Sequence, residues 1–280
     1  MTPRKIICPI DFSAGARHAL RVATRLANES GAPLVLAHAW FIPPIAIAGE
    51  FPLPADAIQG MVDDAQRGLT DAVTEAKKAG VENVTSQLVS GPPAERITEL
   101  AARGDLIVMG THGRTGVPRF LLGSVAERVV RLAPCSVLVA REHGEPQPYR
   151  HILVPLDFSE SSRRALDEAG DLASRTGAIV TLLHILELPA AGLVPEAEHR
   201  ATTLLDEWGE LVEQKTRTRV TRLVKTGAPA QQILASAADD PSIDLIVLGS
   251  HGRTGITRML IGSVAEKVVR HAQRPVLIAR

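Results

Sequence analysis

The sequence predicts two tandem α/β domains, each a doubly wound structure built on a five-stranded parallel sheet. Short apolar runs such as DLIVMG (105–110) and DLIVLG (244–249) are typical of strands buried on both faces. These runs alternate with amphipathic segments, which favours parallel strands joined by right-handed helical crossovers. The pattern occurs twice, since residues 110–130 and 249–269 are identical at fifteen of 21 positions. We therefore expect two copies of one domain.

Matched segments set the boundaries of the two copies. RKIICPIDFSAGARHAL (4–20) and RHILVPLDFSESSRRAL (150–166) open them, and CSVLVAR and RPVLIAR close them. Between the copies lies EHGEPQPY, which is polar, contains proline and is typical of a linker. We expect domain 1 over residues 1–141, the linker over 142–149 and domain 2 over 150–280.

Local signals support the individual elements. Ser13 and Ser159 precede the first helix of each copy, where a hydroxyl accepts hydrogen bonds from free backbone N–H groups. Pro92 and Pro93 suit the start of the third helix. The elements expected in the first copy are strand 5–10, helix 13–29, strand 33–39, helix 55–79, strand 84–89, helix 93–103, strand 105–110, helix 124–133 and strand 136–140.

Composition narrows the classes of function. Lys and Arg number 31, as do Asp and Glu, and this neutrality argues against a nucleic acid or membrane partner, which needs a basic face. The N-terminus runs directly into a strand without a secretory apolar region, and the most apolar stretch is too interrupted by a histidine, prolines and a glutamate to be a membrane-spanning helix. We therefore expect a cytoplasmic protein. Cys8 and Cys135 lack metal-binding or redox spacing and fit buried thiols better than a redox pair.

A glycine-rich segment follows the fourth strand of each copy and leads into a helix. Its spacing is G-x2-G-x9-G-S, and glycine lets the backbone approach an anion closely. The final Gly-Ser opens a helix, whose free N–H groups and dipole favour a phosphate. The alternative is a loop that needs glycine only for its turns. The motif residues are Gly110, Gly113, Gly123, Ser124, Gly249, Gly252, Gly262 and Ser263, with positive charge from Arg114, Arg119, Arg253 and Arg258.

Asp11 and Asp157 follow the first strand of each copy, at the edge where open parallel sheets bind ligands. A carboxylate there accepts from ribose hydroxyls or caps the following helix, and the two uses are compatible. The sequence lacks the Walker A lysine and the dinucleotide fingerprint after the first strand. It also lacks zinc spacing, a nucleophile elbow and the kinase motifs.

Taken together, these motifs resemble the universal stress protein family. P-[IL]-D-F-S on the first strand, L-x-H-A or L-L-H-I on the second, and G-x2-G-x9-G-S carry the resemblance over nearly all of both halves. The resemblance implies the tandem, ATP-binding type, with strand order 3-2-1-4-5 in each domain. It also implies edge pairing of the last strands, so the copies are expected as a pseudo-two-fold internal pseudo-dimer. A homodimer of chains is left open.

The same resemblance implies one adenine nucleotide site in each copy. Phosphates are expected at the later motif glycines and the serine, ribose at the aspartate and first glycine, and adenine beside the residue after the strand-two histidine. The first site comprises Pro9, Asp11, Ala39, Met109, Gly110, His112, Gly113, Arg114, Gly123, Ser124 and Val125. The second comprises Pro155, Asp157, Ile185, Leu248, Gly249, His251, Gly252, Arg253, Gly262, Ser263 and Val264.

The expected function is a nucleotide-dependent stress-response regulator that binds ATP with little or no hydrolysis. Neither glycine-rich loop contains a carboxylate to hold a metal, although magnesium can bind through the phosphates with mostly water ligands. His112 and His251 either orient water or cap backbone. The alternatives are a slow ATP hydrolase or phosphotransfer enzyme, and a scaffold in which nucleotide is only structural. The sequence does not identify the protein partner.

Other features leave several interpretations open. His38 and His184 occupy matching strand positions, where a satisfied strand-end histidine is favoured over a ligand or a pH sensor. Trp40, Phe41 and the insert 41–55 fit a cover over the first site, a partner surface or an ordinary surface loop. Ala39 against Ile185, together with the one-sided insert, predicts that the two sites differ in affinity.

Overall fold

A computed structural model of the chain describes residues 2–41, 54–111, 122–141, 146–187, 194–252 and 261–280. The chain divides into two compact units, with the boundary between Pro146 and Gln147.

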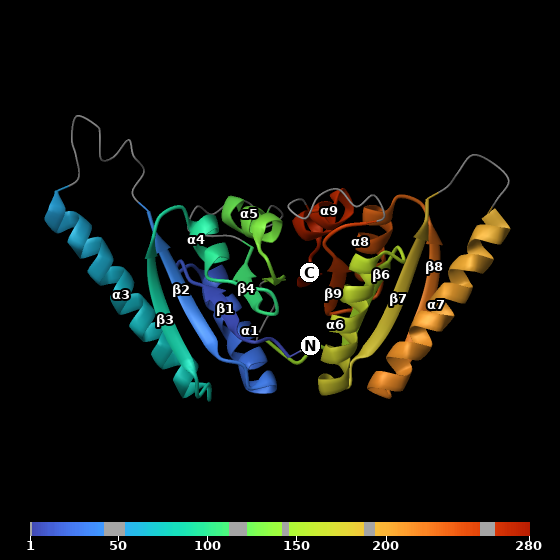
Figure 1. Cartoon of the computed structure of the whole chain (residues 1–280), viewed down its shortest axis with the longest axis horizontal. Helices are drawn as coiled ribbons and strands as arrows, with labels where there is room; N and C mark the ends of the chain where they lie inside the picture. The colour runs from blue at the N-terminus through green and yellow to red at the C-terminus, as the bar shows by residue number, and fades with distance from the viewer. Residues whose placement is uncertain (1, 42–53, 112–121, 142–145, 188–193, 253–260) are drawn as a thin grey trace. The chain divides into compact units, whose positions relative to one another are not determined.

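The first unit alternates strands and helices as the sequence predicts (Figure 1). Its strands are parallel, and the described residues run β1 Ile6–Pro9, α1 Ala14–Ser30, β2 Leu34–Trp40, α3 Ala55–Lys78, β3 Val84–Ser90, α4 Pro93–Glu99, β4 Leu106–Gly110, α5 Ser124–Leu132 and β5 Ser136–Ala140.

The second unit repeats this order in its described residues. It runs β6 His151–Leu156, α6 Glu160–Thr176, β7 Ile179–Leu186, α7 Val194–Thr216, β8 Val220–Thr226, α8 Pro229–Asp239, β9 Leu245–Gly249, α9 Ser263–His271 and β10 Val276–Ala279.

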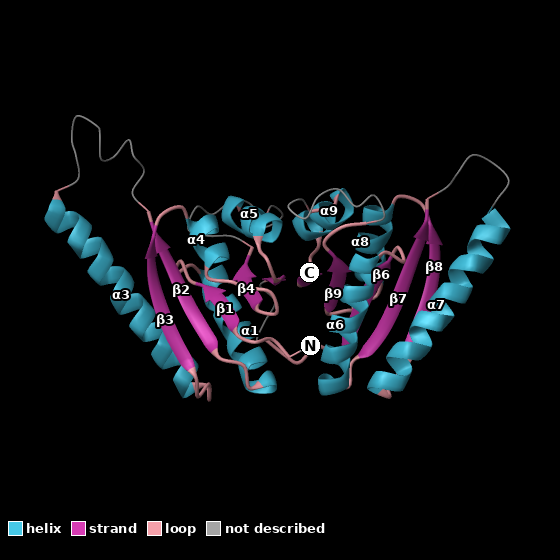
Figure 2. Ribbon diagram, in the orientation of Figure 1, coloured by secondary structure: helices cyan, strands magenta, loops and turns pink. Residues whose placement is uncertain are grey.

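Strand order follows the doubly wound pattern in both units. Neighbouring strands read β3-β2-β1-β4-β5 in the first unit and β8-β7-β6-β9-β10 in the second, which confirms the order 3-2-1-4-5. Right-handed crossovers place α1 and α3 on one face of the first sheet and α4 and α5 on the other (Figure 2). The order reverses between β1 and β4, and between β6 and β9. Ligands bind at the carboxyl ends of strands at such points.

The first helix of each unit begins and ends as its sequence predicts. Ser13 caps α1 by accepting from the Ala16 amide, and Ser159 caps α6 by accepting from the Ser162 amide. Both helices end at a glycine with φ of 69°, a left-handed conformation that glycine adopts at little cost. These caps confirm the predicted helix starts.

Helix α4 is shorter than expected. We expected a helix to Arg103, but α4 ends at Glu99 because the chain then turns toward β4. The Asp105 carboxylate accepts a hydrogen bond from the Ala102 amide at 2.8 Å, and Gly104 has a φ of 89°. This turn replaces the last helical residues that we predicted.

The centre of the first sheet is apolar and buried. Ile6, Ile7 and Cys8 of β1 are fully buried, as is Ile107 of the neighbouring β4. Both cysteines are buried free thiols, and burial raises the pKa of Cys8 well above its usual range. None of the helices in the described ranges combines the length and apolar character needed to cross a bilayer.

Candidate functional site

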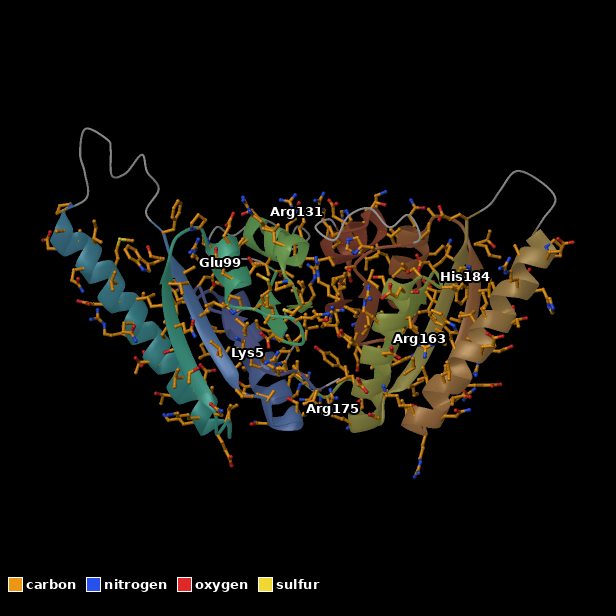
Figure 3. The ribbon with its side chains drawn as sticks, viewed as in Figure 1. Lys5, Glu99, Arg131, Arg163, Arg175 and His184 are labelled. Atoms are coloured by element: carbon orange, nitrogen blue, oxygen red, sulfur yellow. The ribbon has the colours of Figure 1, made fainter. Side chains whose placement is uncertain are left out.

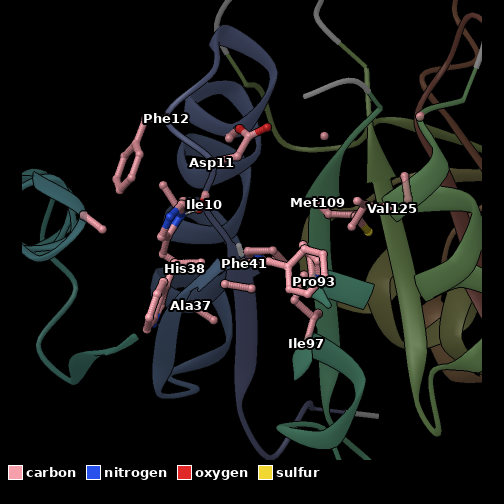
Figure 4. Close-up of a pocket in the computed structure, with 18 of the residues that line it drawn as sticks. Ile10, Asp11, Phe12, Ala37, His38, Phe41, Pro93, Ile97, Met109 and Val125 are labelled. Atoms are coloured by element: carbon pink, nitrogen blue, oxygen red, sulfur yellow. Dashed lines mark hydrogen bonds between the residues drawn. The ribbon is translucent and has the colours of Figure 1, made fainter. Parts of the chain in front are cut away.

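A cavity of about 750 Å³ opens at the carboxyl ends of β1, β2 and β4 in the first unit (Figure 4). Its size is in the range of small-molecule sites. His112, Gly113 and Arg114 lie outside the described residues. All the other residues expected in the first site line this cavity: Pro9, Asp11, Ala39, Met109, Gly110, Gly123, Ser124 and Val125.

Several lining residues were not part of the predicted set. Pro93 and Ile97 come from the first turns of α4, where their i, i+4 spacing puts them on one face of the helix. Figure 4 shows them beside Phe41 and Met109. The helix-face spacing was readable from the sequence, but which face met the cavity was not. Others that the sequence analysis missed include Ile10, Phe12, Met61, Asp64 and Ala65.

The Asp-Phe-Ser turn after β1 holds the Asp11 carboxylate in place. Asp11 Oδ1 accepts from the Ser13 amide at 3.0 Å and from the Ser13 hydroxyl at 2.5 Å. The intervening Phe12 has a φ of 65°, which is uncommon for a residue with a side chain. Asp11 therefore supports the helix start while lining the cavity, although Ser13 rather than Asp11 is the N-cap.

His38 connects the ends of β1 and β2. Its Nδ1 lies 2.6 Å from the backbone oxygen of Ile10, and because that oxygen only accepts, Nδ1 is the donor. The ring packs against Phe12 with a centroid separation of 4.7 Å. A Cβ added to Gly68 of α3 would lie 2.5 Å from the Phe12 ring, so the glycine lets the ring pack this closely against α3.

The first glycine of each motif allows close packing of backbone against backbone. A Cβ on Gly110 would lie 2.8 Å from the backbone carbon of Gly15, and one on Gly249 would lie 2.6 Å from that of Ser161. Beyond the loop, the Gly123 amide donates to the Thr111 oxygen at 2.7 Å. This bond brings the start of α5 back to the end of β4.

The second unit repeats these contacts around its own turn. Asp157 Oδ1 accepts from the Ser159 amide and hydroxyl at 3.0 and 2.6 Å, and Phe158 has a φ of 62°. His184 Nδ1 donates to the Leu156 oxygen at 2.7 Å. The His184 ring packs on the Phe158 ring with a centroid separation of 4.6 Å. Figure 3 labels His184, which lies on β7.

The second glycine-rich segment returns toward this turn. A Cβ on Gly252 would lie 2.9 Å from Asp157 Oδ2, so the two predicted site residues are close. The Gly262 amide donates to the Ser250 oxygen at 2.7 Å, as its counterpart does in the first unit. Arg253 lies outside the described residues, and so do Arg119 and Arg258. The other predicted residues stand at matching strand ends and helix starts: Pro155, Ile185, Leu248, Gly249, Ser263 and Val264.

His251 makes local contacts. Its amide donates to the Ser161 hydroxyl at 3.2 Å, and its Nδ1 lies 2.8 Å from the Ser250 hydroxyl. These contacts hold the backbone of the loop where it leaves β9. In the described part of the chain, no group of three or more His, Cys, Asp or Glu side chains is arranged to hold a metal.

The two sites differ where the second strand ends. The Gly91 amide donates to the Trp40 oxygen at 3.0 Å, and the Gly227 amide donates to the Leu186 oxygen at 3.0 Å. The next residues are therefore equivalent. The first unit has Phe41 there, which is 42% exposed and lines the cavity, and the second has an exposed Glu187. The remainder of the predicted insert, residues 42–53, lies outside the described residues.

Comparisons with known proteins agree with the duplicated architecture. The universal stress protein family model matches residues 2–141 and 148–280. Universal stress protein Rv2623 of Mycobacterium tuberculosis is 30% identical over 288 residues, covering 98% of this chain and 96% of the relative. Universal stress protein Rv2005c of the same organism is 33% identical over 231 residues, covering 78% and 77%.

A solved structure shows the same fold over the whole chain. The crystal structure of a universal stress protein from Archaeoglobus fulgidus superposes with a TM-score of 0.77 at 22% identity. The match covers 99% of this chain and 96% of that chain.

Proposed function

The chain belongs to the universal stress protein family, and on this premise we propose that it binds one ATP in each unit as a nucleotide-dependent stress-response regulator. One observation carries the proposal. Residues from the ends of β1, β2 and β4 and from the start of α5 converge on one cavity, and they include every described residue expected there. We propose the same role for the equivalent residues of the second unit.

The helix starts support phosphate binding at the motif serines. Helices α5 and α9 begin at Ser124 and Ser263, and their N-cap residues, Gly123 and Gly262, provide no side-chain cap. By contrast, serines cap α1 and α6 in the same units. The first amides of α5 and α9 are therefore not capped by the preceding side chain, and together with the helix dipole they favour an anion.

Gly262 supports the close approach of a ligand. It has a φ of −66°, which any residue adopts, and a Cβ there would lie 3.5 Å from its nearest neighbours. The packing of the described residues therefore leaves room for a side chain at this position. We propose that glycine is needed because the phosphates of ATP lie against the backbone here.

We propose little or no hydrolysis because of how the turn carboxylates are used. Efficient phosphoryl transfer needs a metal held by carboxylates and a residue that positions water. Asp11 and Asp157 each commit one oxygen to the serine two residues later, at the end of the site proposed for ribose. Magnesium bound with ATP would then take mainly phosphate and water ligands, which serves binding rather than turnover.

The nucleotide content of the purified protein tests the proposal. Protein prepared without added ATP is denatured and its released nucleotide measured by chromatography, and stripped protein is titrated with ATP, ADP, cAMP and GTP by calorimetry. We expect about two ATP per chain and no sustained phosphate release. Steady turnover would instead favour a slow hydrolase or phosphotransfer enzyme. No bound nucleotide and no heat would contradict the proposal.

Matched glycine variants separate regulation from a purely structural nucleotide. We expect Gly123→Ala and Gly262→Ala each to remove one ATP per chain. Binding of the still unidentified protein partner should then change, whereas a scaffold would bind its partner equally well in all forms. We also propose the internal pseudo-dimer and a cytoplasmic location. The homodimer is left open, and sedimentation velocity of the intact chain tests it.

A further inference from the structure

The same three-residue contact occurs in both units behind the aspartate of the candidate site. A histidine on the second strand donates from Nδ1 to the backbone oxygen just before the aspartate, at 2.6 Å for His38 and 2.7 Å for His184. Each ring also packs on the phenylalanine just after the aspartate. Figure 4 shows His38, Ile10, Phe12 and Asp11 gathered on one side of the cavity.

The hydrogen bond acts on the backbone of the aspartate. The Ile10 oxygen and the Asp11 nitrogen belong to one planar peptide unit, so donation from His38 fixes the orientation of that unit. On the other side, the Ser13 amide and hydroxyl hold Asp11 Oδ1. The carboxylate is thus restrained from both directions along the chain.

The phenylalanine conformation needs such support. A positive φ is unfavourable for a residue with a Cβ and persists where surrounding contacts over-determine it. In the first unit the Phe12 ring lies between His38 and Gly68. In the second, Phe158 lies against His184 and meets Trp208 edge-on at 5.4 Å. The packing against α3 and α7 differs between units, whereas the histidine contact is the same.

We propose that His38 and His184 are positioning residues for the bound nucleotide, acting through the carboxylates of Asp11 and Asp157. The inference rests on the proposed function. In the second unit Asp157 Oδ2 lies near Gly252, so the histidine contact extends from β7 through the turn to the glycine-rich segment. Donation from Nδ1 holds the carboxylate ready for the ribose hydroxyls, and this preorganisation contributes to affinity.

Two substitutions separate the donor from the ring. His38→Phe keeps a ring against Phe12 and loses the donor, whereas His38→Asn keeps an N–H near the Nδ1 position and loses the ring. Both are made in the full chain carrying Gly262→Ala, so that calorimetry with ATP reports the first site. We expect His38→Phe to weaken ATP binding about tenfold and His38→Asn to change it by less than about threefold.

The second unit provides the matched control. His184→Phe in the same background should leave the ATP affinity of the first site unchanged, and it should weaken the second site when Gly123→Ala is the background. Urea unfolding of the ligand-free variants measures stability separately. A purely structural role would lower the free energy of unfolding in both His38 variants without separating their ATP affinities.

A ligand-free measurement keeps the inference testable even without ATP binding. Hydrogen exchange of the Ser13 amide reports its bond to Asp11. We expect faster exchange in His38→Phe and near-parental exchange in His38→Asn. Unchanged exchange, or equal ATP affinity in both variants and the parent, would overturn the positioning role. If the parent binds no ATP, the proposed function fails, and the exchange result alone decides whether His38 positions Asp11.

Discussion

Glycines at the candidate sites serve two different purposes. Gly249 lets β9 pack against Ser161 at the start of α6, and a side chain there would overlap backbone. Gly262 has an ordinary φ, and among the described residues its surroundings leave room for a side chain. We therefore expect one glycine to serve the fold and the other to serve the proposed ligand.

Alanine at these two glycines should separate the two purposes. We expect Gly249→Ala to lower the free energy of unfolding by about 1–3 kcal/mol, because the new Cβ overpacks against Ser161. Gly262→Ala should leave stability nearly unchanged while removing one bound ATP. Urea unfolding and calorimetric stoichiometry measure the two effects, and equal loss of stability in both variants would contradict the assignment.

The cysteine thiols should be inert in the folded protein. Cys8 and Cys135 are 0% and 2% exposed, and burial raises the pKa of Cys8, which suppresses the reactive thiolate. We expect almost no reaction with a thiol reagent in native buffer and two equivalents in denaturant. Rapid native labelling of either cysteine would show that the sheet opens locally.

The sequence patterns predicted those residues of the candidate site that directly follow a strand. Asp11 and Gly110 follow strands of a doubly wound sheet, so their meeting at the switch point follows from strand order alone. Met61 and Asp64 line the cavity because of how α3 packs, which the sequence pattern does not specify. The positive φ of Phe12 also depends on tertiary contacts, here with His38 and Gly68.

At the scale of elements, the caps of α1 and α6 connect helix stability to the candidate sites. Ser159 accepts from the Ser162 amide and also donates to Asp157, so one side chain serves both. We expect Ser159→Ala to lower the free energy of unfolding by about 1 kcal/mol and to weaken ATP binding at the second site. Ser174→Ala near the end of α6 is the control, since that hydroxyl donates to the local backbone oxygen of Asp171. If Ser159→Ala lowered the free energy of unfolding but left ATP affinity unchanged, Ser159 would serve only as a helix cap.

Helix α7 and strand β8 are joined by a charge cluster. Arg222 donates to Glu213 at 3.0 Å and lies 3.1 Å from Asp206. A Cβ on Gly209 would lie 2.6 Å from this guanidinium. The Arg222 hydrogen bond lowers the pKa of Glu213 below its ordinary value. Because the Glu213 side chain is 38% exposed, solvent screening keeps the contribution to stability small.

This cluster predicts a pH effect of known sign. A carboxyl group whose pKa is lowered in the folded state stabilises the folded protein at pH values above its ordinary pKa. That contribution is lost as the pH falls through the pKa of the folded state. We therefore expect Arg222→Ser to make the fall in unfolding free energy between about pH 5 and about pH 3 shallower. Arg219→Ser, at an exposed position, is the control. An equally steep fall in both variants would contradict the assignment.

At the scale of the whole molecule, the two units are repeats with unequal sites. Phe41 and Ala39 in the first site correspond to Glu187 and Ile185 in the second, next to the expected position of adenine. An aromatic ring stacks on any base, whereas a carboxylate accepts from an amino group. The two ATP affinities should therefore differ.

Nucleotide removal should reveal this inequality in the intact chain. ATP at about a hundred times its dissociation constant adds about 2.7 kcal/mol to a unit that binds only when folded. We expect the stripped protein to melt at lower temperature, and increasing ATP to stabilise one unit before the other. Melting curves of Gly123→Ala and Gly262→Ala assign the order, and identical curves for the two variants would contradict unequal sites.

Gly209 of α7 and its counterpart in α3 differ in size, which makes the two helices difficult to exchange between the halves of the chain. Burial along α3 from Ala65 to Ala76 repeats along α7 from Leu205 to Thr216, which sets the fully buried Leu69 opposite Gly209 in the alignment. A crossover that joined α3 to β8 would bring a leucine to the position where the Arg222 guanidinium now packs against a glycine, and the arginine would have to move. In the second unit α7 and β8 therefore fit one another through Gly209 and Arg222, a fit that α3 would not reproduce.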